Sequence, residues 1–233
     1  MKNAADWVKA SFQYEFASPE LLTQSLTHRS STGLNNERLE FLGDAVLDTV
    51  ISEVVYRQRP FATEGELSRL RSALVKDTSL AELALELGIG EYLILGPGEK
   101  KAGGHRRSSI LADAVEALFG AVYLDSGYAA AMQVIFSAFG DRLMNLPDAA
   151  DLRDSKTRLQ ERLQAAKVPL PEYEVTDVHG QAHKQSFVVA CRIPTLALQV
   201  TGNGGSRRDA EQDAADTMLE LLDQQPARGN TND

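Results

Sequence analysis

Acidic residues at regular spacing are the first feature of this sequence that could do chemistry. Within the stretch Asn36–Asp48, Glu37, Glu40 and Asp44 lie at i, i+3 and i+7, so a helix would align them in one stripe. The apolar residues beside that stripe are Leu39, Leu42 and Val46. The pattern predicts a half-buried helix whose carboxylates run along the edge of its buried face.

A second acidic pair lies in a stretch of very different composition. Residues 109–120 are almost wholly apolar, and their only charges are Asp113 and Glu116, again at i and i+3. A helix of this composition is suited to burial, where an unpaired carboxylate is strongly destabilising or shifts its pKa until it is neutral. Something must therefore compensate Asp113 and Glu116.

Two kinds of partner could compensate these carboxylates. Lys or Arg side chains could pair with them, or a hard divalent cation such as Mg²⁺ could collect oxygens from both helices and retain some waters. For Asn36–Asp48 alone, a solvated acidic face with ion pairs is the commoner outcome. For the helix of Asp113 and Glu116 the lack of other polar residues leaves no wide solvated face. A metal or catalytic site and a solvated face with ion pairs are therefore equally supported for this helix.

A carboxylate-bound Mg²⁺ beside a phosphodiester would lower the pKa of a bound water and stabilise developing oxyanion charge, which is the chemistry of phosphoryl transfer. The basic loop Lys100–Arg107 leads directly into the Asp113 helix, with Ser108 or Ser109 as its expected cap. These cations could bind backbone phosphates or could neutralise the acids, and both interpretations stay open.

Helices are predicted to position these acids throughout the first part of the chain. Apolar residues recur at three- and four-residue spacing from Ala4 to Leu146, without strand patterns. The clearest runs are Leu39–Tyr56, Leu67–Leu87, Ser109–Leu124 and Ala129–Leu146. Turn residues such as Gly96-Pro97-Gly98 separate the runs. Residues 1–147 are therefore predicted to form one all-helical domain.

The periodicity stops at residues 148–154, which have the composition of a linker. An amphipathic helix over Ser155–Ala166 follows, with Ser155 as its expected N-cap. Three alternating stretches and a final helix come next: Tyr173–Val178, Ser186–Ile193, Leu196–Thr201 and Ser206–Leu222. The order α-β-β-β-α predicts a compact α+β unit over residues 155–223, and the polar tail 224–233 is expected to be disordered.

The charge of the chain argues against a broadly basic surface, since the formal net charge is -9. Residues 1–151 hold 14 Lys and Arg against 21 Asp and Glu, and residues 152–233 hold 10 against 12. Contact with nucleic acid would therefore come from local clusters. The acidic excess in the first part needs an explanation such as bound metal ions or a solvated surface.

The single cysteine, Cys191, excludes an internal disulfide, a thiolate metal site and a CxxC redox pair, and it is expected to be buried. No run of about 18 apolar residues could span a bilayer. Residues Met1–Ala10 lack the apolar core of a signal peptide. The expectation is a cytoplasmic protein with no membrane partner.

The stretch Asn36–Asp44, NERLEFLGD, closely resembles the signature of the ribonuclease III family. Ile110–Gly120 resembles the other catalytic stretch of that family, and Gly96–Arg107 fits the loop before it. The resemblance spans Trp7–Leu222 and implies a multidomain protein. Its all-α ribonuclease III catalytic domain would be followed by an α+β double-stranded RNA-binding domain.

The resemblance also implies roles for the acids. Glu40, Asp44, Asp113 and Glu116 would bind Mg²⁺, for which Mn²⁺ could substitute, and no small-molecule cofactor is implied. Asp44 and Glu116 are the implied catalytic residues. Glu116 would be the ligand most directly tied to catalysis, and Asp44 would help to set the nucleophilic water.

Three further residues match the family near the cleft or the subunit interface. Glu37 and Glu64 match acids of the family, although structural or dimer-interface roles are equally open for them. Phe41 resembles a dimer-interface residue. The family works as a homodimer, because each subunit supplies one acidic cluster and two clusters cut the two strands of one duplex.

The implied reaction is hydrolysis of double-stranded RNA, giving 5′-phosphate ends and short 3′ overhangs. The implied substrates are ribosomal RNA precursors and structured messenger, transfer and other RNAs. Two alternatives from other classes are an RNA-binding regulator that has lost catalysis and a helical scaffold with a fortuitous α+β module. Neither alternative explains why both acidic pairs are present.

The second unit resembles a double-stranded RNA-binding domain, which reads A-form shape across two minor grooves and the phosphates between them. The implied RNA-binding residues are Gln160, Glu161, His183, Ser206, Arg207 and Arg208. Gln181 stands where many such domains have Pro, and Glu211 where many have Lys, with Asp209 close by. We therefore expect weaker duplex binding, with a shallower salt dependence, than a strongly basic domain would give.

Overall fold

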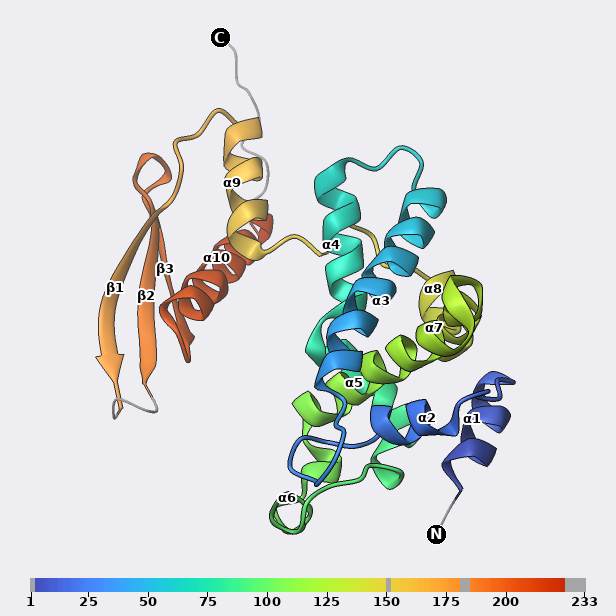
Figure 1. Cartoon of the computed structure of the whole chain (residues 1–233). Helices are drawn as coiled ribbons and strands as arrows, with labels where there is room; N and C mark the ends of the chain where they lie inside the picture. The colour runs from blue at the N-terminus through green and yellow to red at the C-terminus, as the bar shows by residue number, and fades with distance from the viewer. Residues whose placement is uncertain (1–2, 150–151, 181–184, 225–233) are drawn as a thin grey trace. The chain divides into compact units, whose positions relative to one another are not determined.

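The chain divides into two compact units, residues 1–152 and 153–233 (Figure 1). The computed structural model describes residues 3–149, 152–180 and 185–224. The tail expected to be disordered is residues 224–233, of which only Gln224 belongs to this described part. Gln224 itself is the last residue of a helix.

Helices make up the first unit, which confirms the predicted all-α class. They are α1 (Ala4–Phe12), α2 (Pro19–Ser25), α3 (Glu37–Gln58), α4 (Glu64–Val75), α5 (Asp77–Leu87), α6 (Pro97–Lys101), α7 (Ser108–Phe139) and α8 (Asp141–Met144), with the 3-10 turns η1 (Ile89–Glu91) and η2 (Gly104–Arg106). None of the helices in the described part of the chain has the length and apolar character needed to cross a bilayer.

The helical runs of the first unit are interrupted at two places. The apolar run Leu67–Leu87 is divided into α4 and α5, because Lys76 adopts an extended conformation with φ -62° and ψ 148°. Within α7, the predicted runs Ser109–Leu124 and Ala129–Leu146 are separated at Gly127, whose φ of 78° and ψ of -174° are not helical, so two helical segments meet there at a kink. Periodicity continues through Lys76, so only the backbone angles reveal the first interruption.

The core of the first unit is built around α7. Its first half is buried on nearly every side, and Leu111, Leu118 and Phe119 are at most 1% exposed. Helices α2, α3 and α5 pack against α7, and Figure 1 shows α3 and α7 crossing. Asp113 and Glu116 therefore lie on the central helix of the domain, and they are the only partly open positions in its buried stretch Ile110–Val122.

Helices α3 and α7 cross with their backbones in contact at two glycines. A Cβ atom added to Gly43 would lie 1.8 Å from the carbonyl oxygen of Glu116, and one added to Gly120 would lie 2.2 Å from that of Leu39. Neither position has room for a side chain. Because the helices approach this closely, residues just beside Gly43 on α3 face residues just before Gly120 on α7.

The second unit is a three-stranded antiparallel sheet with two helices, which confirms the predicted α-β-β-β-α order. Its elements are α9 (Ser155–Ala165), β1 (Glu172–His179), β2 (Ser186–Ile193), β3 (Leu198–Gly204) and α10 (Arg207–Gln224), with the 3-10 turn η3 (Pro194–Leu196). The first pairing joins Tyr173 to Cys191 and the second joins Cys191 to Val200. Both helices pack on one side of the sheet, as Figure 1 shows. Cys191 is buried as expected.

The helix caps differ from the predicted ones. Asp154 is the N-cap of α9 and accepts a hydrogen bond from the Thr157 amide, whereas Ser155 donates to Asp216 on α10. Helix α7 already begins at Ser108, and its N-cap, Arg107, makes no side-chain capping bond. At α9 two adjacent residues could each have capped the helix, and tertiary contacts with α10 decide between them.

Candidate metal centre and RNA-binding face

Three carboxylates from two helices form a compact cluster in the first unit. Glu40 on α3 and Asp113 and Glu116 on α7 each offer an oxygen atom, and these oxygens lie within 4.8 Å of one another. The glycine crossing explains this arrangement, because Glu40 is three residues before Gly43 and Glu116 is four before Gly120. The cluster is the only such group of His, Cys, Asp or Glu residues found in the described part of the chain.

Asp44 lies beside this cluster but is not one of its three closely spaced carboxylates. Its side chain is exposed, yet its charge acts on Glu116 more strongly than that of any other acid. Of the four acids that the sequence suggested as metal ligands, the structure thus brings three into ligating distance and places the fourth next to them.

Burial and mutual repulsion make these carboxylates hard to ionise. Burial, followed by the charges of Asp44, Glu40, Asp113 and Asp77, raises the pKa of Glu116 to about 8. Burial is also the largest cause that raises the pKa values of Glu40, Asp44 and Asp113. Asp77, at the start of α5, was missed by the sequence analysis because it belongs to no acidic stripe.

No positive side chain in the described part of the chain pairs directly with the cluster, although the charge of Arg29 acts against the rise in the pKa values of Glu40 and Asp113. Within the described residues, no Lys, Arg or His forms an ion pair with Glu40, Asp113 or Glu116. Three hard oxygen donors, raised pKa values and no cationic partner are the properties expected of a divalent-cation site. The residues present therefore fit a divalent metal ion, and the ion-pair alternative of the sequence analysis does not apply to them.

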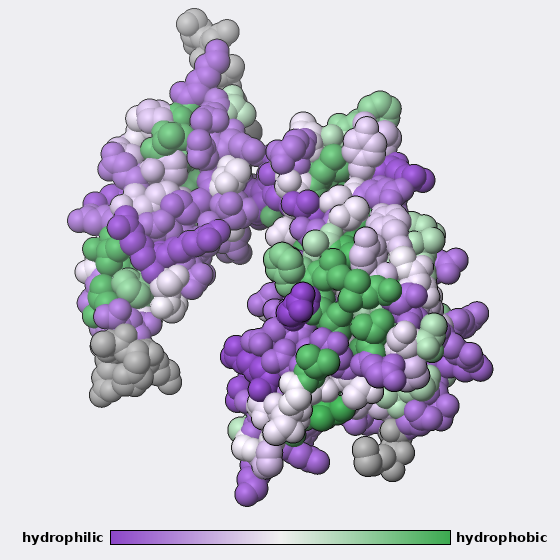
Figure 2. Space-filling model, viewed as in Figure 1, coloured by the Kyte–Doolittle hydropathy of each residue, from purple (hydrophilic) through white to green (hydrophobic). Residues whose placement is uncertain are grey.

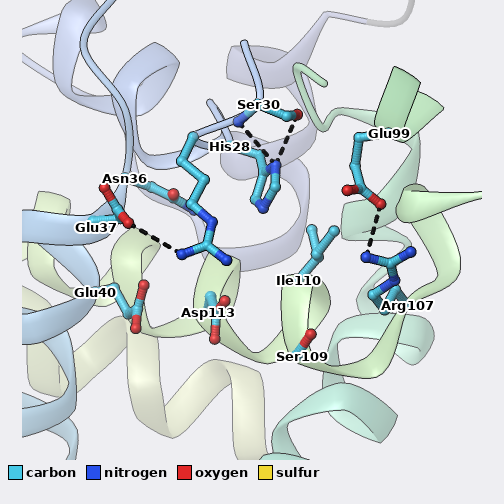
Figure 3. Close-up of a pocket in the computed structure, with 11 residues that line it drawn as sticks. His28, Ser30, Asn36, Glu37, Glu40, Glu99, Arg107, Ser109, Ile110 and Asp113 are labelled. Carbon is cyan, nitrogen blue, oxygen red and sulfur yellow. Dashed lines mark hydrogen bonds and ion pairs between the residues drawn. The ribbon is translucent and has the colours of Figure 1, made fainter. Parts of the chain in front are cut away.

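An open cavity of about 680 Å³ adjoins Glu40 and Asp113, which lie side by side in Figure 3. Its far wall consists of residues that the sequence analysis did not single out: His28, Arg29, Ser30 and Glu99. Arg107, from the basic loop, pairs with Glu99 at 3.0 Å and not with the carboxylates of the cluster. The cavity therefore presents cationic groups opposite the acids, which suits a phosphate backbone placed over the cluster.

The remaining sequence-predicted residues of this unit lie around the cluster. Glu37 also lines the cavity and forms an ion pair with Arg29 at 3.5 Å. Glu64, the first residue of α4, accepts a hydrogen bond from Ser68 and lines a separate depression beside Tyr56. The acid cluster found in the described part does not include Glu37 or Glu64.

Phe41 follows Glu40 directly and is 81% exposed. Ala45, one turn later on α3, is exposed as well. Figure 2 shows a continuous apolar area over α3 on this face of the helical unit. Exposed aromatic side chains and apolar surface areas are both common at subunit interfaces.

Substitution of Gly43 by Ala is expected to disturb the cluster without removing any acid. The added methyl group overlaps the backbone of Glu116, so α3 and α7 must move apart and the distances between Glu40 and Glu116 must increase. We expect a loss of about 1–3 kcal/mol in the free energy of unfolding and weaker metal binding. Thermal unfolding and metal titration would measure both.

Gly98→Ala is the matched control, because nothing lies within 4 Å of the Cβ position at Gly98. If Gly43→Ala bound metal as tightly as Gly98→Ala does, the close crossing would have no role in forming the site.

The candidate RNA-binding residues of the second unit lie on its two helices. Gln160 and Glu161 are exposed on α9, and Arg207 and Arg208 are exposed in the first turn of α10. Ser206 precedes α10, and its hydroxyl group accepts from the Asp209 amide and donates to the Asp209 carboxylate at 2.7 Å. His183 lies outside the described residues.

Several of these groups already have partners within the domain. Arg153 forms an ion pair with Glu161. Arg207 donates through Nε to Glu211 at 2.8 Å, and Lys156 donates to the same carboxylate at 2.6 Å. Burial would raise the pKa of Glu211, but the hydrogen bonds from Lys156 and Arg207 outweigh it and lower that pKa. The sequence analysis missed Lys156, whose neighbours on α10 are far away in sequence.

Comparisons with known proteins match both units. The family model described as Ribonuclease-III-like covers residues 18–143, and the one described as double-stranded RNA binding motif covers residues 155–222. The curated "Ribonuclease 3" of Alkalilimnicola ehrlichii is 54% identical over 98% of this chain and 100% of its own length. That of Shewanella amazonensis is 54% identical over 91% of this chain and 93% of its own.

Solved structures match the first unit. The nuclease domain of ribonuclease III from Campylobacter jejuni is 39% identical and aligns with a TM-score of 0.59, covering 63% of this chain and 100% of that domain. A second structure of that nuclease domain, 41% identical with a TM-score of 0.56, covers 57% of this chain and 94% of its own. That structure is described as showing structural flexibility in a region involved in dimer formation.

A helical nuclease domain with a carboxylate cluster, followed by a double-stranded RNA-binding domain, defines a class of two-domain endoribonuclease. The chain belongs to the ribonuclease III family.

Proposed function

We propose that this endoribonuclease hydrolyses phosphodiester bonds in double-stranded RNA with the help of Mg²⁺, leaving 5′-phosphate ends and short 3′ overhangs. The observation that carries the metal dependence is the cluster of Glu40, Asp113 and Glu116, whose oxygens lie within 4.8 Å of one another. The double-stranded RNA-binding motif over residues 155–222 supports the choice of substrate.

Glu40, Asp113 and Glu116 would hold the ion, and Mn²⁺ would be able to replace Mg²⁺ because it accepts the same oxygen donors. When bound, the ion activates water and stabilises charge on the phosphate oxygens. The exposed carboxylate of Asp44 stands next to Glu116 and would orient a water at the edge of the cluster. Arg29 and Arg107, across the cavity, would hold the phosphate backbone of the strand to be cut.

The working unit is proposed to be a homodimer. One chain carries one cluster in its described part, so cutting both strands of a duplex needs two chains related by a twofold axis. The exposed Phe41 and the apolar area over α3 support an interface next to the acids. Glu37 and Glu64 would serve at the cleft or at this interface.

RNA recognition is assigned to the second unit. Gln160 and Glu161 on α9 are proposed to contact one minor groove, and His183 a second. Ser206, Arg207 and Arg208 are proposed to contact phosphates at the N-terminus of α10, where the helix dipole favours negative charge. Such contacts read the shape of the duplex more than its sequence.

The proposed setting follows from this specificity. An enzyme that recognises duplex shape would process ribosomal RNA precursors and structured messenger, transfer and other RNAs in the cytoplasm. Linker residues 148–154 would join the catalytic domain, residues 1–147, to the RNA-binding domain, residues 155–223.

Cleavage of a long labelled RNA duplex by the full chain, with Mg²⁺ and with EDTA, is the test of this function. We expect cutting with Mg²⁺ only, 5′-phosphate product ends, and little cutting of single-stranded RNA or DNA. Light scattering should give a mass of twice the 25.4 kDa of one chain. A protein that binds duplex RNA but cuts none with Mg²⁺ or Mn²⁺ would instead be an RNA-binding regulator.

A further inference from the structure

The start of α10 carries a carboxylate where a phosphate-binding surface would have only cations. Arg207 is the first residue of the helix, and its side chain is 65% exposed. Glu211 lies one turn further along and accepts the Arg207 Nε hydrogen at 2.8 Å. One of the two guanidinium groups in the first turn of α10 is therefore already bound to an acid of its own helix.

Glu211 is held in place from the opposite side. The Lys156 ammonium group on α9 donates to its second oxygen at 2.6 Å and also lies 4.6 Å from the centre of the Tyr173 ring. The side chain of Glu211 is only 12% exposed. Because Lys156 binds the second oxygen of Glu211 and itself lies over the Tyr173 ring, the carboxylate is held beside Arg207.

We propose that Glu211 competes with the RNA backbone for Arg207 and thereby limits the affinity of this domain for duplex RNA, an inference that rests on the proposed RNA-binding role of α10. In the free domain, Arg207 is paired with Glu211. In the complex, Arg207 turns to a phosphate, and Glu211 remains as a fixed negative charge one turn below it, paired only with Lys156.

The effect on binding follows from this geometry. A phosphate at the N-terminus of α10 must either draw Arg207 away from this ion pair or share its guanidinium group with Glu211, and in both cases it lies near a carboxylate that repels it. An ion pair whose cation is largely exposed contributes little to the stability of a fold. Its larger consequence here is the number of cations that remain available to RNA.

Glu211→Gln should release Arg207 while keeping the shape of the side chain. Removal of one charge at roughly 7 Å from a phosphate predicts binding that is about three- to tenfold tighter at low salt. One additional phosphate contact predicts a dependence of log K on log salt that is steeper by about 1. Binding of the full chain to a labelled duplex of roughly 32 base pairs, two spans of such a domain, would be measured in Ca²⁺ over a range of KCl concentrations.

Glu220→Gln is the matched control. It makes the same charge change on the same helix, nine residues later and about 13 Å away along the axis, which exceeds the screening length of about 10 Å at 0.1 M salt. Glu220 is exposed, and its substitution should leave both the affinity and the salt dependence close to the wild-type values.

A double-mutant cycle separates competition for Arg207 from a purely structural role. In an Arg207→Gln background, Glu211→Gln has no guanidinium group to release, so the steeper salt dependence should disappear and the gain in affinity should shrink to the part that comes from removing a charge that repels the phosphate. Thermal unfolding of each variant would report folding independently.

The outcomes distinguish this inference from the proposed function. Tighter binding and a steeper salt dependence in Glu211→Gln, with the steeper dependence lost when Arg207 is also replaced, support the competition. Unchanged affinity and salt dependence in Glu211→Gln, or a salt dependence that stays steeper without Arg207, would overturn it while wild-type cleavage stands. Wild-type protein that neither binds nor cuts duplex RNA would overturn both.

Discussion

Substitution of Glu116 by Gln is expected to lower the rate of duplex cleavage by about 10³-fold or more. Glutamine keeps the size of the side chain but removes the charge of one of the three oxygen donors that lie within 4.8 Å of one another. Metal-borne stabilisation of phosphate charge amounts to several kcal/mol, and about 4 kcal/mol corresponds to roughly 10³-fold in rate. Single-turnover cleavage of a labelled duplex by saturating enzyme in Mg²⁺ would measure the loss.

Binding of the duplex should survive this substitution. The proposed phosphate contacts are on the second unit and on the cationic wall of the cavity, whose lining does not include Glu116. Binding in Ca²⁺ should therefore stay within about twofold of wild type. Glu82→Gln, on the exposed face of α5, is the control for an amide introduced elsewhere. Cleavage by Glu116→Gln at the rate of Glu82→Gln would remove Glu116 from the site.

The helical class and the acidic pairs could be predicted from the sequence because both depend on helical periodicity. Asp113 and Glu116 stood out for a physical reason, since a helix that is buried on nearly every side has no solvated face for them. The family resemblance joined Glu40 to this pair. The close crossing at Gly43 and Gly120 brings the three acids together. The spacing of the acids along either helix does not predict this crossing.

The opposite wall of the cavity was harder to predict. His28 and Arg29 lie between α2 and α3, and Glu99 lies in the short helix α6. These segments have no long periodic pattern that would indicate which side chains face the cavity. Lys156 shows the same difficulty in the second unit. Its partners, Glu211 and Tyr173, lie on other elements, so only the packing of α9 with α10 and β1 reveals the contact.

Affinity of the metal-free protein for Mg²⁺ is expected to rise by about tenfold per pH unit up to about pH 8, and then to level off. The pKa of Glu116 is raised to about 8, first by burial and then by Asp44, Glu40, Asp113 and Asp77. Below that pH the carboxyl group holds a proton that must leave before it can bind a cation, so one proton is exchanged for each ion. Calorimetric titration in buffers of different ionisation enthalpy would measure both the affinity and the proton release.

The same proton sets the pH dependence of folding. An ordinary Glu, with a pKa of 4.5, ionises in the unfolded chain well before Glu116 does in the folded one. Between pH 4.5 and about 8 the folded state binds the extra proton, so the free energy of unfolding falls as pH rises through this range and changes no further above it. Because the site is partly open to solvent, we expect a loss of only about 1–3 kcal/mol.

Glu116→Gln connects the two effects, because it has no carboxyl group to titrate. Metal-free Glu116→Gln should be more stable than wild type at pH 8 and close to it at pH 4.5, the reverse of what the loss of a stabilising ion pair would give. Added Mg²⁺ should stabilise wild type and leave the variant almost unchanged. If the variant were the less stable protein at pH 8, Glu116 would be a carboxylate already compensated within the chain, and the cluster would have no need of a metal ion.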